Sequence, residues 1–516
     1  MSNKTYYVTT PIYFLNADPH IGHTYTTVAA DVISRYKKER GYDVKFLTGS
    51  DEHGQKVERA AEAVGVSPQE YVDSLVTVFK DVWSIMNCDY DYFSRTTNPA
   101  HEATVKKIFK KLYDQGDIYK GSYEGLYCTP CETFFTERDL ENGNCPDCGR
   151  AVENVTEESY FFRLSKYQKQ LEEHFENNPD FLLPISRKNE MMNNFIKPGL
   201  EDLCVSRTTF TWGVPVDFDP GHIVYVWIDA LPNYISALGF MSDDDSDYKK
   251  YWPADLHLMS KEIVRFHTII WPCILLALGE PLPQQVFSHG WLQYDGKKMG
   301  KSLGNAINPK SLIDEYGVDA IRYFLMREFT FGPDGNFTQT ALINRYNADL
   351  ANDLGNLLSR TVGMVDKYFG GTLPSLDFSE TTFGKELKEI AVNMLGKVEE
   401  KMDKLQFSEA LNETWNLVRR ANKYIDESAP WVLAKEESKK AELANVLYNL
   451  AEVLRIVAIA IKPVMPNTPK FIYEGLNITD EKIKTWDSGK EFGLLNREVI
   501  VTKAAPAFPR VDKDKK

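Results

Sequence analysis

The sequence contains no long run of apolar residues. The nearest approach is RIVAIAI at 455–461, which is much shorter than the roughly 20 residues that a membrane-spanning helix requires. The amino-terminal segment MSNKTYYVTTPIY also lacks the basic and then apolar stretch of a signal peptide. We therefore expect a cytoplasmic protein with no membrane segment.

Cysteine and positive charge are both scarce. Seven cysteines among 516 residues are too few for a disulfide framework. Asp and Glu outnumber Lys and Arg, and the net charge of −14 argues against a general nucleic-acid coat, although a local basic face is compatible with it. A chain of this length exceeds what one hydrophobic core usually supports, so we expect roughly two to four domains.

The first fifty residues have the pattern of a β-α-β unit. TYYVTT at 5–10 and DVKFLTGSD at 43–51 have the composition of strands. Between them, apolar residues recur at helical spacing up to a glycine at position 41. These residues are Ile21, Tyr25, Val28, Val32 and Tyr36. The pattern predicts an α/β fold with a Rossmann-type, doubly wound parallel sheet, which binds ligands at the carboxyl ends of its strands.

The rest of the chain divides by pattern into further regions. The α/β pattern of residues 1–117 is interrupted at 118–221 by cysteine pairs and mixed polar segments, which we interpret as an insertion. Strand and helix patterns resume at 222–325, so we expect the sheet to continue there. Residues 326–369 form a linking region with a long amphipathic helix, and residues 370–516 predict an all-α helix bundle.

A histidine pair opens the first predicted helix. In PHIGH at 19–23, His20 and His23 are three residues apart, so both project from the first turn. The exposed amides and the dipole of that end attract anions, and Gly22 permits close approach to the backbone. The segment is typical of a phosphate site. Metal ligation and simple capping are alternatives that the spacing leaves open.

A basic loop, YDGKKMGKS at 294–302, is unexpected in an acidic chain. Its spacing is not that of a Walker A loop, and alone it is typical of a solvated turn. Together with the HIGH segment at 20–23, however, KMGKS at 298–302 resembles the KMSKS signature of class I aminoacyl-tRNA synthetases. The resemblance implies four catalytic residues, which are His20, His23, Lys298 and Lys301. It implies ATP contacts from Gly22, Glu262, Lys298, Lys301 and Ser302.

The chemistry agrees with this resemblance. An amino-acid carboxylate is already ionised at neutral pH and can attack the α-phosphate of ATP without a general base. The site must instead supply in-line positioning and neutralise the charge of the triphosphate. Gly300, in place of the usual serine, keeps both lysines of the motif, while the role of Lys297 stays open.

Further segments resemble one family within this class, the methionyl-tRNA synthetases, along nearly the whole chain. They are TTPIYFLNADPHIGH, GSDEHGQKV, YVWIDALPNYI, EIVRFHTIIWP and HGWL. The resemblance implies activation of methionine by ATP with Mg²⁺, then transfer to tRNA(Met) with first attack by the 2′-hydroxyl. A synthetase for another amino acid is the rival within the class. A non-catalytic zinc-knuckle tRNA-binding protein is the rival outside it, and the two signature motifs speak against that.

The same resemblance assigns a methionine site. Asp51 would meet the ammonium group, and Glu262 would hold the ATP ribose, unless it is only a surface glutamate. An aromatic slot suits the polarizable thioether, although tryptophans are more often core residues. The implied slot residues are Ile12, Tyr13, Trp227, Ala230, Leu231, Tyr234, Ile263 and His267, with Trp271 behind them. Ser260 stands where the family commonly has glycine, and would either crowd the ribose or add a hydrogen bond.

Two cysteine pairs lie in the predicted insertion. CTPC and CPDC are separated by thirteen residues, a spacing that indicates a tetrahedral Zn²⁺ site. Its ligands would be Cys128, Cys131, Cys145 and Cys148. Four thiolates leave no open position for substrate, so the site should be structural, with a redox dithiol as the alternative. The lone cysteines at 88, 204 and 273 are expected to be small buried residues.

In the helical third, the resemblance points to anticodon recognition. Asn356 and Arg360 are one turn apart and offer forked donors to base edges, while Trp431 offers a stacking plane. A solvated helix face and a tryptophan packed on the core are the alternatives. The insertion is too short for the large editing domain of related synthetases. The chain also ends soon after the bundle, without the carboxyl-terminal appendage of longer relatives, so we expect a monomer.

Overall fold

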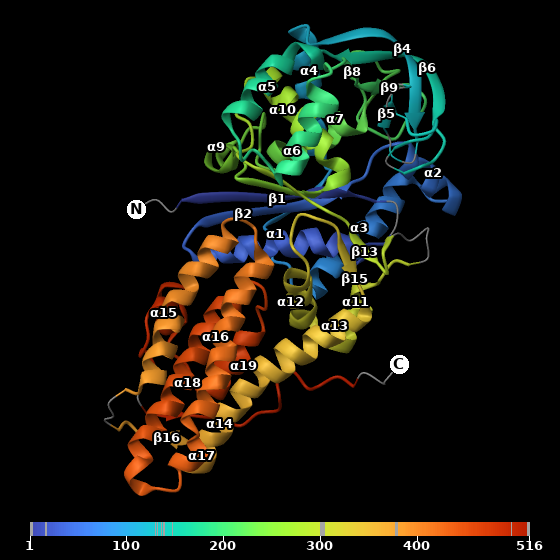
Figure 1. Cartoon of the computed structure of the whole chain (residues 1–516). Coiled ribbons are helices and arrows are strands. Elements are labelled where there is room, and N and C mark those ends of the chain that lie inside the picture. Colours follow the sequence, from blue (N-terminus) through green and yellow to red (C-terminus); the bar gives the residue numbers. More distant parts are fainter. Residues whose placement is uncertain are drawn as a thin grey trace.

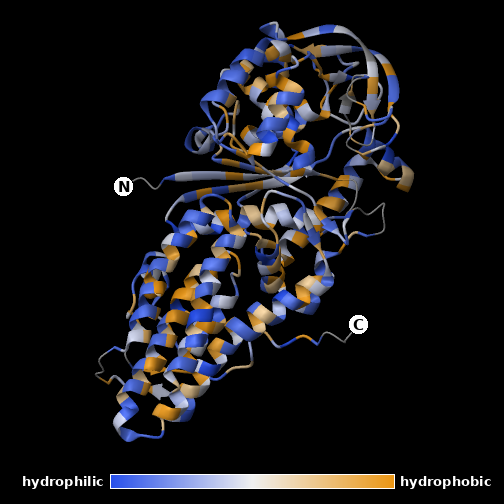
Figure 2. Ribbon diagram, in the orientation of Figure 1, coloured by the Kyte–Doolittle hydropathy of each residue, from blue (hydrophilic) through white to orange (hydrophobic). Residues whose placement is uncertain are grey.

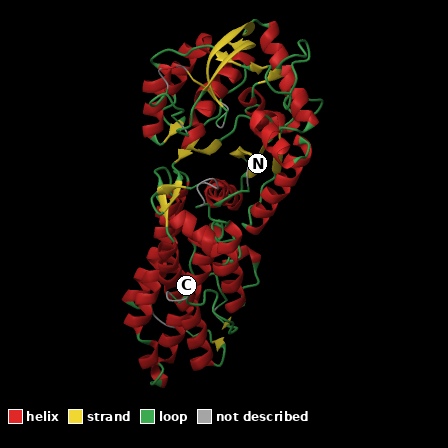
Figure 3. Cartoon of the chain, turned by 90° about the vertical axis from the view of Figure 1, so that its right-hand side faces the viewer, coloured by secondary structure: helices red, strands yellow, loops and turns green. Residues whose placement is uncertain are grey.

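The computed structural model describes residues 4–15, 18–129, 131, 133–135, 137, 140–146, 148–299, 305–376, 380–496 and 498–512. The molecule is elongated, with an α/β part at one end and a helical part at the other (Figure 1). Nearly all of the strands lie in the α/β part (Figure 3). The predicted parallel sheet and helix bundle are therefore both present.

A six-stranded sheet forms the centre of the α/β part, and every neighbouring pair in it is parallel. In order across the sheet, the strands are β3 (Tyr92–Arg95), β2 (Asp43–Asp51), β1 (Thr5–Phe14), β11 (Leu256–Ser260), β12 (Val286–His289) and β7 (Leu182–Leu183). The strand order reverses between β1 and β11, because β2 and β3 follow on one side of β1 and the later strands on the other. A doubly wound sheet opens a ligand crevice at such a switch point.

The predicted β-α-β unit is confirmed. Helix α1 (Ile21–Glu39) connects β1 to β2, and its basic last turn suits the negative end of the helix dipole. The five residues predicted at helical spacing are at most 3% exposed. The register of β1 against β2 shifts between Thr9 and Ile12, next to Pro11, which has no amide to donate.

Helices pack on both faces of the sheet and build two hydrophobic cores (Figure 1). One core holds α1, α3 (Pro68–Ile85), α11 (Pro309–Tyr316) and α12 (Val318–Glu328), and continues into the bundle. The other core holds α4 (Pro99–Asp114), α5 (Gln168–Asn177), α7 (Val226–Ala230), α8 (Asn233–Ser236), η5 (Phe266–Ile270) and α10 (Trp271–Leu278). The α/β part also contains α2 (Gln55–Val64), α6 (Ile185–Met191) and α9 (Ser246–Tyr251).

The predicted insertion at 118–221 has its own antiparallel sheet and also supplies an edge of the main sheet. The four antiparallel strands are β5 (Thr133–Phe135), β4 (Ile118–Cys128), β6 (Glu153–Phe162) and β8 (Leu203–Cys204). Strand β7, from the same range, pairs with β12. The main sheet resumes at β11 and not at residue 222, where β10 (Ile223–Val224) pairs with β9 (Ser206–Arg207). The sheet therefore continues within 222–325, as expected, but not with its first strand, because an apolar β-branched run does not specify its partner strand.

The helical part begins with one long helix that runs through α13 (Gln339–Arg345), the π-helical η7 (Tyr346–Gly355) and α14 (Asn356–Phe369). The α-helices that follow it are α15 (Thr382–Met402), α16 (Phe407–Ser428), α17 (Pro430–Leu433), α18 (Lys440–Ile461) and α19 (Thr468–Gly475). Figure 2 shows hydrophobic and hydrophilic residues mixed along these helices, as expected for amphipathic helices that share a core.

One bundle segment corrects the prediction that no apolar stretch approaches the length of a membrane span. The helical segment Glu437–Ile461 is long enough to span a membrane, and its most apolar 18 residues have a mean hydropathy of 1.6. All of those 18 residues, however, are buried inside the protein. Polar residues interrupt the apolar pattern in the sequence, and in the fold they have partners inside the protein. Asn449 donates to the Glu380 carboxylate, and Arg455 pairs with Glu452 at 2.9 Å with both side chains 0% exposed.

Buried ionic contacts join the α/β part to the bundle. Arg322 of α12 pairs with Asp31 of α1 at 2.5 Å and donates to the carbonyl oxygen of Val464 at 2.8 Å. Asp319, one turn earlier, accepts from the backbone amide of Thr468 at 2.6 Å. Because burying an ionised group requires full pairing, these contacts fix α1, which opens with the histidine pair, relative to the bundle.

Candidate active site

A cavity of about 470 Å³ opens at the switch point of the sheet. The carboxyl ends of β1, β2, β11 and β12 form its floor, and α1 and α7 contribute walls. Twelve of the predicted site residues line it: Ile12, Tyr13, His20, Gly22, His23, Asp51, Trp227, Ala230, Leu231, Glu262, Ile263 and His267. The fold therefore gathers residues from widely separated segments in one place.

The cavity also has lining residues that we did not predict. They are Pro11, Phe14, Thr26, Lys56, Val226, His289, Gly290, Trp291, Leu292 and Met299. The sequence pointed to four of them, because the segment HGWL at 289–292 is part of the family resemblance. For Thr26 no signal existed, because its place follows from a hydrogen bond between its Oγ1 and His289 Nε2, 2.7 Å apart. Ser260, which we expected beside the ribose, also lines the cavity.

The two histidines cap α1 and also face the cavity. The Nδ1 atom of His20 accepts the Gly22 amide at 3.1 Å, and the Nδ1 atom of His23 accepts the His20 amide at 3.1 Å. A neutral imidazole whose Nδ1 accepts carries its proton on Nε2. The capping alternative is thus correct, yet capping leaves each ring with one Nε2–H donor.

Both rings are neutral at physiological pH. Burial lowers the pKa of His20 to about 4, partly opposed by the charge of Glu262. Burial and the neighbouring His20 lower the pKa of His23 to about 3. The arrangement is therefore a pair of neutral N–H donors beside a helix amino terminus, which suits phosphate oxygens.

Asp51 lies at the end of β2 and is 6% exposed. Its neighbour Glu52 is held by Arg95, whose guanidinium donates to both carboxylate oxygens at 2.7 and 2.8 Å. Thr97 also donates to Glu52, at 2.6 Å. The backbone that carries Asp51 is therefore firmly anchored, as a binding carboxylate requires.

The aromatic slot is built from stacked and hydrogen-bonded rings. Trp227 stacks on Phe266 with ring centroids 3.8 Å apart. Burial lowers the pKa of His267 to about 4, and its Nδ1 lies 2.9 Å from the Ile263 carbonyl oxygen. Its Nδ1 is then the protonated nitrogen, and its Nε2 accepts from the Tyr234 hydroxyl at 2.8 Å. Tyr234 lies behind the cavity wall, where it orients His267, with the buried Trp271 next to it.

The hydroxyl of Ser260 contacts a predicted site residue. Its hydroxyl donates to the Glu262 carboxylate, and the Trp291 indole N–H donates to the same group. The adjacent Lys261 pairs with both oxygens of Asp334 at 2.8 and 2.9 Å. Ser260 therefore adds a hydrogen bond that orients Glu262.

The basic loop is only partly described. Strand β13 (Leu292–Tyr294) turns back through Asp295 and Gly296, both with positive φ, into β14 (Lys297–Lys298). Met299, which follows, is buried and lines the cavity. The hairpin thus brings Met299 to the cavity. The predicted Lys301 and Ser302, as well as Gly300 and the side chain of Lys298, lie outside the described residues.

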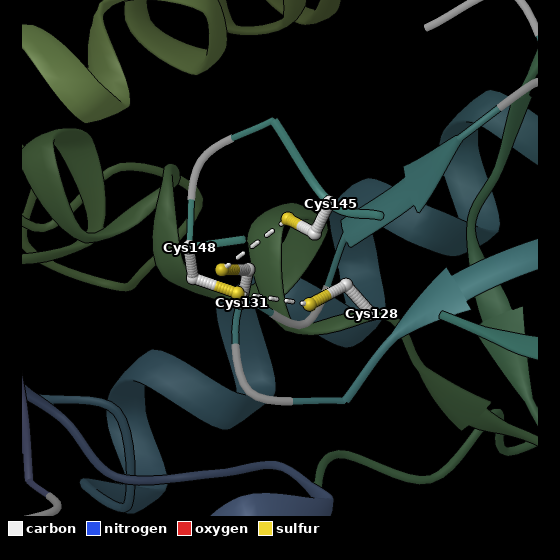
Figure 4. Close-up of side chains that lie close together, drawn as sticks. All are labelled: Cys128, Cys131, Cys145 and Cys148. Atoms are coloured by element: carbon white, nitrogen blue, oxygen red, sulfur yellow. Dashed lines mark hydrogen bonds between the residues drawn. The ribbon is translucent and has the colours of Figure 1, made fainter. Parts of the chain in front are cut away.

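The four cysteines of the insertion converge (Figure 4). Their Sγ atoms all lie within 4.8 Å of one another, with 3.6 Å between Cys128 and Cys148 and 3.8 Å between Cys131 and Cys145. A tetrahedron with Zn–S bonds of about 2.3 Å has sulfur–sulfur edges of about 3.8 Å. The cluster therefore fits a Zn²⁺ ion. The lone cysteines at 88, 204 and 273 are buried, as predicted.

The predicted anticodon residues lie on α14 and α17. Asn356 is exposed, and Trp431 is 45% exposed, so the tryptophan is not a core residue. Arg360 pairs with Asp426, near the end of α16, at 3.1 Å. Because α17 follows α16 directly, this pair brings α14 close to the segment that carries Trp431.

Comparison with known proteins identifies the family. A family profile described as tRNA synthetases class I (M) matches residues 6–155 and 150–362, and one described as anticodon binding domain of methionyl tRNA ligase matches residues 379–516. The chain belongs to the methionyl-tRNA synthetase family. Its fold class is that of the family, as predicted, and its reaction is the activation of methionine by ATP and the charging of tRNA.

Individual relatives agree along the whole chain. A methionine–tRNA ligase of Caldanaerobacter subterraneus is 62% identical over 512 residues, which cover 99% of this chain and 80% of that protein. The Bacillus subtilis methionine–tRNA ligase is 52% identical over 99% of this chain and 78% of its own length. The structure of Mycobacterium tuberculosis methionyl-tRNA synthetase in complex with methionyl-adenylate matches with a TM-score of 0.94 at 40% identity, covering 98% of this chain and 100% of that one. The rivals considered from sequence, another amino acid or a non-catalytic tRNA-binding protein, are thereby excluded.

Proposed function

We propose that the cavity at the switch point is where methionyl-adenylate forms, with a defined role for each predicted residue. The observation that carries this proposal is the pair of neutral Nε2–H donors on His20 and His23, in the same cavity as the buried Asp51. Asp51 binds the methionine ammonium, and the slot around Trp227 and His267 holds the thioether. The two histidines and the lysines of the KMGKS segment bind the triphosphate.

The reaction needs no general base at this site. An oxygen of the methionine carboxylate attacks the α-phosphorus of ATP, the new P–O bond forms, and the bond to the bridging oxygen of pyrophosphate breaks. No proton moves in this step, so charge stabilisation and alignment supply the catalysis. The rings of His20 and His23 do not need to change protonation state, which agrees with their low pKa values.

Glu262 is the proposed ribose contact. Ser260 and Trp291 each donate one hydrogen bond to its carboxylate, which has about four lone-pair positions. The remaining positions suffice for ribose hydroxyl groups. Mg²⁺ enters with ATP, bound by the phosphates whose charge it neutralises.

We propose that the cysteine cluster binds one structural Zn²⁺ per chain through four thiolates. Replacing Cys145 by Ser should reduce the zinc content from about one ion per chain to near zero and lower the melting temperature, because structural zinc contributes directly to folding. Metal analysis and thermal unfolding measure both effects. Cys204→Ser is the matched control, since Cys204 is equally buried but lies outside the cluster. Full zinc retention by Cys145→Ser would contradict the four-thiolate site.

The helical part is the proposed anticodon reader, through Asn356 and Arg360 on α14 and Trp431 on α17. Replacing Trp431 by Ala should spare methionine-dependent pyrophosphate exchange and reduce tRNA charging by about 5- to 150-fold, the loss of one stacked base at about 1–3 kcal/mol. Exchange and charging assays on the same preparation separate the two steps.

Phe471→Ala is the control for this variant. The two aromatic side chains are almost equally exposed, Phe471 at 46% and Trp431 at 45%. They differ in place, because Phe471 lies on α19, close to the contacts with α12, whereas Trp431 lies on α17. The control should leave both assays unchanged. Normal charging by Trp431→Ala would show that the tryptophan does not read the anticodon.

The remaining assignments complete the proposal. The enzyme acts in the cytoplasm as a monomer. Its functional regions are the catalytic halves at 1–117 and 222–325, the zinc-bearing connective insertion at 118–221, the linking region at 326–369 and the anticodon-binding region at 370–516. The α/β part thus activates the amino acid, and the helical part selects the tRNA.

A further inference from the structure

A buried cluster outside the cavity joins the two halves of the proposed methionine site. Asp229 of α7 is 1% exposed, and both of its carboxylate oxygens are engaged. Its Oδ2 lies 2.7 Å from His53 Nδ1, and its Oδ1 lies 3.0 Å from His101 Nε2. The three side chains are at most 4% exposed. None of them lines the cavity.

Each member of this cluster belongs to a different element. His53 follows Asp51 by two residues, in the loop between β2 and α2. His101 lies in the first turn of α4, and its Nδ1 is 2.7 Å from the hydroxyl of Ser236 on α8. Asp229 lies on α7, whose neighbouring residues form the methionine slot. The cluster therefore connects the loop that carries Asp51 to the helix that carries the slot.

Helix α7 needs such an anchor. It has only five residues and no side-chain cap at its amino terminus, and so short a helix is not stable by itself. Four of its residues or close neighbours line the cavity: Val226, Trp227, Ala230 and Leu231. On its other side, Asp229 supplies the buried polar contact that fixes its position.

The charges within the cluster are complementary. Burial disfavours the charged form of Asp229, but His53 and His101 outweigh it and lower the pKa of Asp229 to about 2. Burial also opposes protonation of His53. The negative charge of Asp229 outweighs this effect, with smaller contributions from Glu102 and Glu52, and so raises the pKa of His53. Asp229 is thus a buried carboxylate, and removing one partner of such a group is costly.

We propose that the cluster of His53, Asp229 and His101 positions the methionine site by setting the separation between Asp51 and the slot on α7. This inference rests on the proposed role of Asp51 in binding the ammonium group. The proposed ATP contacts stand on other elements, since His20 and His23 open α1 and Glu262 follows β11. Disturbing the cluster should therefore affect methionine far more than ATP.

The test is steady-state pyrophosphate exchange with the full-length Asp229→Asn enzyme. Asn keeps the size of the side chain and one acceptor oxygen but removes the charge. The KM for methionine should rise at least about 10-fold, with the KM for ATP changed less than about twofold. Asp319→Asn is the control for general destabilisation, because Asp319 is a buried acceptor at the bundle contact. It should lower the melting temperature and leave the methionine KM unchanged.

A second pair of variants decides the outcome if Asp229→Asn does not fold. His101→Gln keeps an amide N–H near the position of Nε2, whereas His101→Leu removes the donor. The Gln variant should retain the wild-type methionine KM, and the Leu variant should raise it. An unchanged methionine KM in Asp229→Asn, an equal rise for ATP, an equal effect of Asp319→Asn, or identical kinetics of the two His101 variants would overturn the proposal.

Asp51→Asn, measured in parallel, separates this inference from the proposed function. A normal methionine KM in Asp51→Asn would refute the role of Asp51 in ammonium binding. A raised methionine KM in Asp229→Asn would then assign the cluster to positioning the slot helix alone.

Discussion

Replacing His23 by Asn should slow the formation of methionyl-adenylate by about 10²- to 10³-fold, the usual effect of removing one donor to a charged transition state. Asn places its amide group near the position of Nδ1, so the cap on the His20 amide, 3.1 Å in the structure, can persist. The Nε2–H donor is lost. Methionine binding should change little, because the triphosphate and not the amino acid meets this donor. Single-turnover adenylate formation and equilibrium methionine binding measure the two effects.

His23→Gln is the matched variant for this prediction. Its longer side chain places an amide N–H near the position of Nε2, and a glutamine at this third helical position can still accept from the His20 amide. We therefore expect it to retain more activity than His23→Asn at similar stability. Equal activities of the two variants would show that His23 serves the reaction only through the cap.

Replacing Asp51 by Asn should raise the KM for methionine by at least about 30-fold, because breaking a buried charge pair costs about 2–5 kcal/mol. Asn has nearly the same shape as Asp, so the anchoring of the loop through Glu52 and Arg95 should persist. Pyrophosphate exchange over a range of methionine concentrations measures the effect, and thermal unfolding checks the fold.

An analogue of methionine without the amino group is the control for Asp51. As a competitive inhibitor, 4-(methylthio)butanoate should bind the wild-type and Asp51→Asn enzymes with similar affinity, because it carries no ammonium to pair. A large loss of affinity for this analogue would mean that the substitution damaged the slot. An unchanged KM for methionine would exclude Asp51 as the ammonium partner.

Local patterns predicted much of this protein because local physics decides them. The helical spacing in α1 and the β-branched runs of β1 and β2 specified the first β-α-β unit, which the structure confirms. The spacing of the two CxxC pairs predicted a four-sulfur cluster, and the four Sγ atoms do converge. The HIGH and KMGKS segments indicated a class I aminoacyl-tRNA synthetase, and further segments indicated the methionyl family, which the comparisons confirm.

Partners distant in the sequence were the part that local patterns missed. The run at 222–226 did not reveal that its strand would pair with β9 and not with a strand of the main sheet. Leu182–Leu183 gave no sign of joining that sheet through β12. In α18 the interrupting polar residues concealed a continuous buried helix, because Asn449 and Arg455 find their partners only in the folded bundle.

The sequence by itself determined which chemical groups this protein has and in which order: two histidines, two lysines, an aspartate, an aromatic set and four cysteines. Only the tertiary structure decided what each group can do. Capping contacts place the protons of His20 and His23 on Nε2. In His267, by contrast, Nε2 accepts a hydrogen bond from the Tyr234 hydroxyl. The physical reason is that protonation and orientation depend on hydrogen-bond partners and burial, and for Asp229 and His101 those partners lie 128 residues apart in the chain.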